Sequence, residues 1–458
     1  MLWHIARKEL TDHMMSLRFA MACGLCLAVF LLTTLVLARE FREAASTYNM
    51  NEVMQRNQML QARGEEGGVP DRLRRGVVAN RPLNPLHILV RGVAPDLTES
   101  VQVLRGGGLD FSASRGDDPV APLFPAVDFV FIVGVIASLL ALAFSYDAVS
   151  GERESGVLKL LMSYSLPRDQ ILLGKWLGGY LALTAPFLLG FAVSLVLAVL
   201  FPEVELDLDA VLGIVCLALV ALLYLGAVYS LGIFVSARTQ LVSTSITVLL
   251  LVWVGLILAY PNMAPYIAAQ LLPAPSRQTV ERQKNEIERD MRRRVEALAR
   301  RESERLGSNA WRDDAFRARA DSLGRETRAR TQKVEDGYAA LLRQQTRWAG
   351  IGARLSPLTS FNLAAFDLAA AGIEQERRFV ASLKAYAQTW DEYAKRKRDE
   401  HGRDPEGTDL SDYPRFSFGY MSAGERLGTV WLDIALLGVW NIFFFMAAYL
   451  AFLRSDIR

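Results

Sequence analysis

Cysteine and histidine are scarce in this sequence, and their scarcity excludes several kinds of chemistry. The 458 residues include three cysteines, Cys23, Cys26 and Cys216, and all three lie in apolar runs. A disulfide-stapled domain is therefore excluded. The C-x-x-C spacing of Cys23 and Cys26 is interpreted as two small packing residues one helical turn apart, not as a redox or metal motif. The four histidines do not cluster with cysteine, so no zinc site is expected.

Catalytic and nucleotide-binding motifs are also missing. The sequence has no G-x-x-x-x-G-K-[ST], so we expect no phosphate-binding loop in this chain, and it has neither H-E-x-x-H nor G-x-S-x-G. We therefore predict no catalytic residue, cofactor or metal in the chain itself, and a membrane-anchored enzyme has no motif in its support. The formal net charge of +2 gives no reason to expect a nucleic-acid partner.

Long apolar runs are what the sequence has in abundance. It is 52% hydrophobic, and its charges are confined to blocks. A helix that crosses a bilayer needs about 20 apolar residues. Six segments qualify, at residues 18–38, 124–146, 176–201, 210–235, 241–260 and 429–453. The first is too long for a signal peptide and lacks an obvious cleavage site. We predict an all-α polytopic membrane protein embedded in a lipid bilayer.

The positions of lysine and arginine in the short loops predict the orientation. The N-terminal segment, the loop 147–175, the turn after the fourth span and the tail 454–458 carry these residues, and they share one side if the spans alternate. Both termini are then cytoplasmic. The long polar regions 39–123 and 261–428 are expected outside, because long domains cross the membrane largely regardless of charge.

Residues 1–17 are predicted to form an amphipathic helix that lies flat on the membrane. Their apolar residues recur at helical spacing, at Trp3, Ala6, Leu10, Met14 and Leu17. A frayed cytoplasmic tail is the alternative. In region 39–123, residues 39–63 are predicted to continue the first span as a helix, and the runs 87–93 and 99–105 are possible strands.

Region 261–428 is predicted to be mostly helical. Residues 276–348 are dense in both signs of charge, and a turn at Gly307-Ser308-Asn309 favours two antiparallel arms. A short apolar stripe runs along the first arm, at Val280, Ile287, Met291, Val295 and Leu298. A solvated helical hairpin and a partner-binding coiled coil remain alternatives.

Two further helices are expected in this region. The first, 358–371, is expected to lie on the outer membrane surface. The second runs over about 374–400, with an apolar face at Phe379, Leu383, Tyr386, Trp390 and Tyr393.

The most informative segment is the polar loop between the second and third spans, residues 147–175. It begins with Glu152, Glu154 and Gly156 and continues into a short amphipathic helix. The apolar residues of that helix are Val157, Leu158, Leu160, Leu161 and Met162. An apolar helix in a polar loop requires a partner that covers it.

This loop resembles the one by which ABC-2 type transporter permeases bind their separate ATP-hydrolysing subunit. The resemblance rests on E-x-E-x-G-x-L-x-x-L from Glu152, on L-P-R ending at Arg168, on the six spans and on the flat N-terminal helix. The insertion at 261–428 is similar to that of a permease subgroup with relatives in copper-enzyme maturation and gliding-motility systems. The resemblance implies a multi-pass protein of the bacterial inner membrane.

The resemblance also implies a mechanism. Two permease chains, identical or different, would assemble with two ATP-binding subunits, which hold the ATP and magnesium. Glu152 and Glu154 would pair with basic groups of the ATPase, and Leu158 and Leu161 would fill a groove on it. Closure of the ATPase would then move spans two and three and drive export or extraction of an unknown substrate. The remaining residues of the expected interface are Gly156, Val157, Pro167 and Arg168.

A second interpretation belongs to a different class. The chain would be a mechanotransmitting or scaffold subunit that drives a periplasmic partner through its external helical domain, with no substrate crossing. The size of the external regions and the few polar residues in the spans favour it. Asn441, near the middle of the sixth span, either hydrogen-bonds to a neighbouring helix or faces a substrate path.

Overall fold

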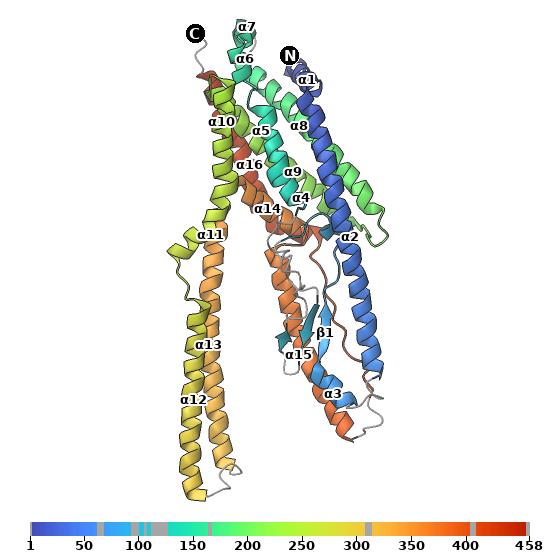
Figure 1. Cartoon of the computed structure of the whole chain (residues 1–458), viewed down its shortest axis with the longest axis vertical. Coiled ribbons are helices and arrows are strands. Elements are labelled where there is room, and N and C mark those ends of the chain that lie inside the picture. The colour runs from blue at the N-terminus through green and yellow to red at the C-terminus, as the bar shows by residue number, and fades with distance from the viewer. Residues whose placement is uncertain are drawn as a thin grey trace. The chain divides into compact units, whose positions relative to one another are not determined.

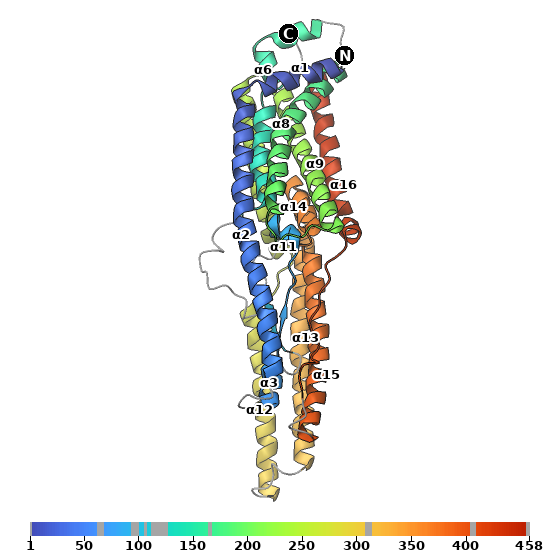
Figure 2. The same ribbon diagram turned by 90° about the vertical axis from the view of Figure 1, so that its right-hand side faces the viewer.

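The computed structural model describes residues 2–61, 68–92, 100–104, 108–110, 127–163, 167–306, 314–403 and 409–454. They form two compact units. The first comprises Met1–Trp253 with Pro357–Arg458, and the second is Val254–Ser356. Figures 1 and 2 show the helices of both units.

Within the described part of the chain, six helices are long and apolar enough to cross a membrane. They confirm the predicted all-α, six-span architecture. Their bounds are Leu17–Gln61, Phe129–Glu154, Arg168–Val199, Leu208–Arg238, Val242–Leu271 and Ala423–Leu453. Four consist of or include a single long helix, namely α2 (Leu17–Gln61), α8 (Arg168–Val199), α9 (Leu208–Arg238) and α16 (Ala423–Leu453).

The second and fifth spans contain π-helical turns. The second is built from α4 (Phe129–Phe131), the π turn η4 (Ile132–Ala137), α5 (Ser138–Ser145) and α6 (Ser150–Glu154). The fifth consists of α10 (Val242–Trp253), the π turn η5 (Val254–Ala259) and α11 (Tyr260–Leu271). The fifth helix continues beyond the predicted end at Tyr260 because η5 widens the turn just before Pro261, which lacks a backbone donor.

Side chains cap the ends of several of these helices. Asp128 accepts a hydrogen bond from the backbone N–H of Phe131 at 2.9 Å, and Asp207 accepts one from Ala210 at 2.7 Å. Ser422 and Glu425 form a reciprocal capping box at the start of α16. These contacts satisfy donors that a helix N-terminus otherwise leaves unpaired, and so they fix where the helices begin.

Helix α9 is the centre of the first unit's bundle. It packs against α16, α5 and α14 (Pro357–Leu368), while α8 packs against α1 (Leu2–Met14) and α2. In the interior, the Phe129 ring lies 5.1 Å from that of Phe191 and 6.4 Å from that of Phe30. This aromatic cluster joins the first, second and third spans.

Helix α14 corrects one expectation. The sequence places residues 358–371 on the membrane surface, but α14 packs among the spans, and Phe361 stacks on Tyr224 of α9 with ring centroids 4.9 Å apart. Helix α14 is apolar on more than one face, and its small side chains Ala364 and Ala365 are both fully buried. Neighbouring helices can pack closely against several faces of such a helix, whereas lipid at the membrane surface would cover only one.

The part of the first unit farthest from α1 is a small α/β domain, here called the α15 domain (Figure 1). It contains α3 (Gly68–Arg75), α15 (Ile373–Arg403) and three antiparallel strands in the order β1-β2-β3, and the 3-10 turn η1 (Pro85–Ile88) that follows β1 packs on α2 and α9 instead. The strands are Val77–Asn80, Ser100–Val103 and Leu109–Asp110. The predicted strand at 99–105 is confirmed as β2. The one at 87–93 is wrong, because Asn84 caps a turn at Leu86 instead.

One hydrophobic core holds this domain together, and both predicted external regions contribute to it. Met59 from the end of α2, Val77 and Ala79 from β1, and Val101 and Val103 from β2 pack against α15. The predicted apolar face of α15 is confirmed, since it is buried here at Phe379, Leu383, Tyr386, Trp390 and Tyr393.

The second unit contains the predicted helical hairpin. Its arms are α12 (Arg277–Leu306) and α13 (Asp314–Ala353), which pack together, and Lys284 of α12 pairs with Glu335 of α13 at 2.6 Å. The predicted corner, residues 307–309, lies outside the described residues. The apolar stripe of α12 is buried or half-buried, from Val280 to Leu298. The arms therefore cover the stripe themselves.

Candidate functional site

The candidate site lies where α1, α6 and α7 (Val157–Ser163) gather at one end of the first unit's bundle, here called the α1 end (Figures 1 and 2). Gly156 separates α6 from α7 and has a φ of 78°, a conformation that glycine adopts without strain. The chain can therefore turn sharply at this point, and two short helices follow each other in different directions.

Lys175 is the electrostatic centre of the α1 end. It lies near the start of α8, and only 3% of its surface is exposed. Its Nζ lies 2.8 Å from Oε1 of Glu9 in α1 and 2.6 Å from Oε1 of Glu152 in α6. A buried ammonium is costly unless it is paired. The two carboxylates supply the pairing, and in doing so they fasten α1 and α6 to the same point on α8.

Close backbone packing brings α1 within reach of Lys175. A Cβ added at Gly178 would lie 2.5 Å from the carbonyl oxygen of Ala6 and 2.6 Å from Cβ of Glu9. Any side chain at this position would push α1 away from α8. Gly178 thus sets the approach that lets Glu9 and Lys175 meet. The predicted N-terminal helix is present as α1, and it lies against α8.

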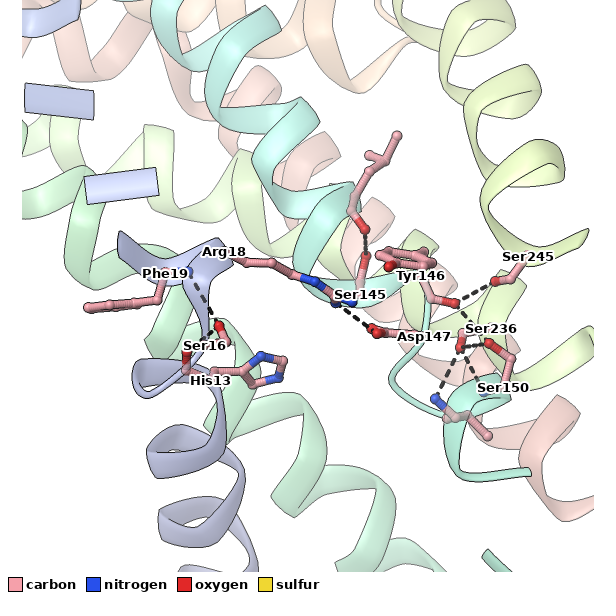
Figure 3. Close-up of polar contacts among 12 residues, drawn as sticks. His13, Ser16, Arg18, Phe19, Ser145, Tyr146, Asp147, Ser150, Ser236 and Ser245 are labelled. Atoms are coloured by element: carbon pink, nitrogen blue, oxygen red, sulfur yellow. Dashed lines mark hydrogen bonds and ion pairs between the residues drawn. The ribbon is translucent and has the colours of Figure 1, made fainter. Parts of the chain in front are cut away.

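A second ion pair joins the start of α2 to the turn between α5 and α6 (Figure 3). Nη1 of Arg18 lies 2.7 Å from Oδ2 of Asp147, and the guanidinium lies 5.0 Å from the ring centroid of Tyr146. Close by, burial lowers the pKa of His13 in α1. The lowered pKa favours the neutral imidazole beside Arg18 and Lys175.

Helix α6 is also tied to the C-terminal end of α9 and to the turn that follows it. The backbone N–H groups of Val149 and Ser150 both donate to Oγ of Ser236 at 3.0 Å (Figure 3). Arg153 donates to the carbonyls of Thr239 and Ala237 at 2.6 and 3.1 Å. A cation thus lies at the C-terminus of α9, where the helix dipole favours it.

Glu154 completes this attachment. Its Oε2 accepts a hydrogen bond from the backbone N–H of Val242, the first residue of α10, at 2.9 Å. A carboxylate at a helix N-terminus is favoured by the same dipole. Glu152 and Glu154 are therefore both engaged within the chain, which qualifies the expectation that their partners are basic groups of another subunit.

The remaining residues of the predicted interface fall into distinct places. Val157 is exposed and Leu158 is buried on α7. Pro167 is the N-cap residue of α8, and the exposed Arg168 donates to the carbonyl of Leu453 at the end of α16, at 3.0 Å. Leu161 belongs to α7, but its side chain lies outside the described residues. Their contact with another subunit stays a prediction.

One residue was missed when the interface was predicted. Leu160 is 67% exposed, the most exposed apolar side chain described on α7. Its spacing of three residues from Val157 places both on one face of the helix, which was the available signal.

In the sixth span, Asn441 lies against α9. Its Nδ2 donates to the carbonyl of Leu223 at 2.8 Å and to that of Leu437 at 2.9 Å. The amide therefore bridges two spans. Among the described residues, no group of three histidine, cysteine or acidic side chains could hold a metal ion.

Comparison with known proteins gives the family. A model of the ABC-2 family transporter proteins matches residues 3–457. The chain belongs to this family. Over 68 residues it is 50% identical to the probable ABC transporter permease protein NosY of Pseudomonas aeruginosa, covering 15% of this chain and 25% of that protein. The NosY of Stutzerimonas stutzeri is 48% identical over 71 residues, which is 15% of this chain and 26% of that protein. The matched segments thus span about a quarter of these relatives.

Proposed function

We propose that the chain is the membrane-spanning permease subunit of an ABC-2 type transporter, with the α1 end in the cytoplasm of a bacterial inner membrane. Membership of the family supports the permease assignment. The lysines and arginines of the α1 end support the orientation, since positive charge in short segments marks the cytoplasmic side. These residues include Arg7, Lys8, Arg18, Lys159 and Arg168.

The exposed apolar face of α7 carries this proposal. Val157 and Leu160 project from a short helix at the very end of the bundle, where water would otherwise surround them. An ATP-binding subunit with an apolar groove would cover them. That subunit would hold the ATP and magnesium, because this chain has no phosphate-binding loop.

The ion pairs behind α7 give the coupling its route. Lys175 ties α6 to α1 and α8, and Glu154 and Arg153 tie it to α9 and α10. A displacement of α7 by the ATPase would then reach the second, third, fourth and fifth spans through these ion pairs and hydrogen bonds. Coupling requires α7 to contact the open and closed ATPase differently. Two permease chains and two ATPase chains would export or extract a substrate whose identity is open.

The test is co-purification of the chain with an ATPase from its native membrane. A stoichiometric ATP-binding-cassette protein is expected with the unaltered chain and is expected to be lost with Leu160→Asp. Leu208→Asp is the matched control, because Leu208 is 83% exposed at the first position of α9, where a carboxylate is tolerated. Recovery of the chain without any ATPase would overturn the proposal.

Mechanotransmission is the second candidate, and one observation favours it. Helix α2 runs without a break for 45 residues, from the α1 end into the core of the α15 domain at Met59. A tilt of the first span would therefore move that domain. The chain would then drive a periplasmic partner and move no substrate.

Deleting residues 277–347, which removes α12 and most of α13, tests a mechanotransmitter whose output passes through the hairpin, not one whose output passes through the α15 domain. A transporter would keep ATPase activity coupled to its substrate, whereas such a mechanotransmitter would keep the ATPase but lose its periplasmic companion and all output. We also propose that the chain belongs to the permease subgroup that carries a large insertion between spans five and six.

A further inference from the structure

The second span is interrupted by a turn at residues 146–149, between α5 and α6. In an unbroken α-helix the N–H groups of Val149 and Ser150 would donate to backbone carbonyls four residues back. Both instead donate to Oγ of Ser236 in α9, each at 3.0 Å. A side chain of the fourth span thus takes the place of two bonds of the helix, and the turn is here called the 146–149 joint.

A second hydroxyl bonds the other side of the 146–149 joint. The carbonyl of Tyr146 accepts from Oγ of Ser245 in α10 at 2.6 Å and from Oγ of Ser150 at 3.0 Å (Figure 3). Ser150, Ser236 and Ser245 are all fully buried. Backbone groups that a break exposes are costly to bury unless they find partners, and here spans four and five supply them.

The same backbone groups have a second way to be satisfied. If residues 146–149 became helical, the N–H of Ser150 would donate to the carbonyl of Tyr146, and α5 and α6 would form one straight helix. A helical serine released from its partner can donate to the carbonyl four residues back in its own helix. The bent and the straight arrangement therefore satisfy the same groups, which makes the joint an element with two discrete states.

We propose that α6 and α7 turn about the 146–149 joint during coupling, and that Ser236 is the positioning residue that holds the joint bent. Helix α6 leads through Gly156 into α7, so straightening the joint would change the direction in which α7 meets the ATPase. The proposal rests on the permease function above and adds the element that would respond to nucleotide.

Further contacts favour the bent state when no force acts on α7. Straightening swings α6 away from the end of α9, so Arg153 must leave the carbonyls of Ala237 and Thr239. Glu154 must also leave the N–H of Val242. The straight state therefore needs a partner that binds α7 more tightly in that state than in the bent one. The nucleotide-bound ATPase is the partner that the proposed function supplies.

Disulfide formation between α6 and α10 measures how often the joint is bent. A Cβ on Gly151 would lie 3.8 Å from Cγ2 of Val242, within reach of a disulfide. In a background with Cys23, Cys26 and Cys216 replaced by alanine, Gly151→Cys and Val242→Cys are oxidised in inside-out native membrane vesicles, and the linked peptide is quantified by mass spectrometry. We expect rapid linking without nucleotide, and linking several-fold slower with magnesium and a non-hydrolysable ATP analogue.

Two serine variants then test the role of Ser236. Ser236→Ala removes the acceptor of two buried N–H groups and is expected to slow linking several-fold without nucleotide, with little further change when nucleotide is added. Ser230→Ala is the matched control and is expected to leave the rate unchanged. Ser230 is also buried in α9 and also accepts from an N–H group, but that group is Nε1 of Trp176 in α8, at 2.8 Å.

The linked chain gives a further readout that a purely structural role would not move. With the joint locked in its bent state, the ATPase should stay bound but turn over ATP several-fold more slowly, and a reductant should restore the rate.

Three results would overturn the inference. They are linking that ignores nucleotide although the ATPase co-purifies, equal slowing by the two serine variants, and full ATP turnover in the linked chain. Absence of any ATPase from the purified chain would instead defeat the proposed function. The comparison of the serine variants needs no nucleotide, so it would still decide whether Ser236 holds the joint bent.

Discussion

Nζ of Lys175 lies 2.6 Å from Oε1 of Glu152, which places the third span and helix α6 in direct electrostatic contact inside the protein. The same ammonium also binds Glu9 of α1. Helix α6, which leads directly into α7 and its exposed face, is therefore held by a buried charge, and force applied to α7 would reach α8 through this ion pair.

Removing this charge should destabilise the chain strongly. Lys175→Met leaves Glu9 and Glu152 close together and unpaired, and breaking a buried ion pair in this way costs about 3–5 kcal/mol. The unfolding midpoint of the purified chain should fall clearly, and adding Glu152→Gln should recover part of the loss. Lys159→Met, at an exposed lysine, should change stability by no more than about 0.5 kcal/mol. Equal midpoints for the two lysine variants would show that the buried pair contributes nothing.

Helix α1 should detach when Gly178 gains a side chain. Gly178→Val forces a Cβ into the 2.5 Å gap to the carbonyl of Ala6. Ala6 is buried, so an Ala6→Cys thiol should react slowly with a maleimide in the parent and at least about tenfold faster beside Gly178→Val. Gly24→Val is the control, because nothing lies within 4 Å of a Cβ there. Unchanged labelling would mean that α1 is held without this contact.

His87 should make stability depend on pH. It lies in η1, and burial, with Arg81 nearby, lowers its pKa from 6.5 to about 4. Between these values the unfolded chain binds more protons than the folded one, so stability should fall as the pH drops from 6.5 towards 4. The full effect is roughly 3 kcal/mol at 1.36 kcal/mol per pKa unit.

The measurement for His87 is the unfolding midpoint between pH 4 and 7, compared with that of His87→Gln. The difference between the two chains should shrink as the pH is lowered through this window, because the variant has no imidazole to protonate. Parallel curves would show that His87 does not titrate on unfolding.

Local periodicity predicted much of this fold. The six spans, the two hairpin arms and the buried face of α15 repeat at spacings that a single sequence displays directly. The position of α14 among the spans was not predictable in this way, because an apolar helix can be covered by lipid or by protein and its sequence does not distinguish them. Tertiary packing against Tyr224 decided it.

The site shows the same division. The loop motif pointed to residues 152–168, but the partners of its charges lie far away in sequence. Lys175 and Glu9 are 166 positions apart, and Glu154 and Val242 are 88 apart. Nothing local in the sequence signals such pairs. The shared face of Val157 and Leu160, by contrast, follows from helical spacing alone.

The central claim is that α7 contacts an ATP-binding subunit, and photo-cross-linking from Leu160 tests it most directly. A photoreactive amino acid is placed at Leu160, or at Leu208 as the control, and native membranes are irradiated. The account predicts that an ATP-binding-cassette protein is linked from Leu160 and not from Leu208. Efficient photolysis at Leu160 that links no such protein, in membranes where the chain is folded and functional, would contradict it.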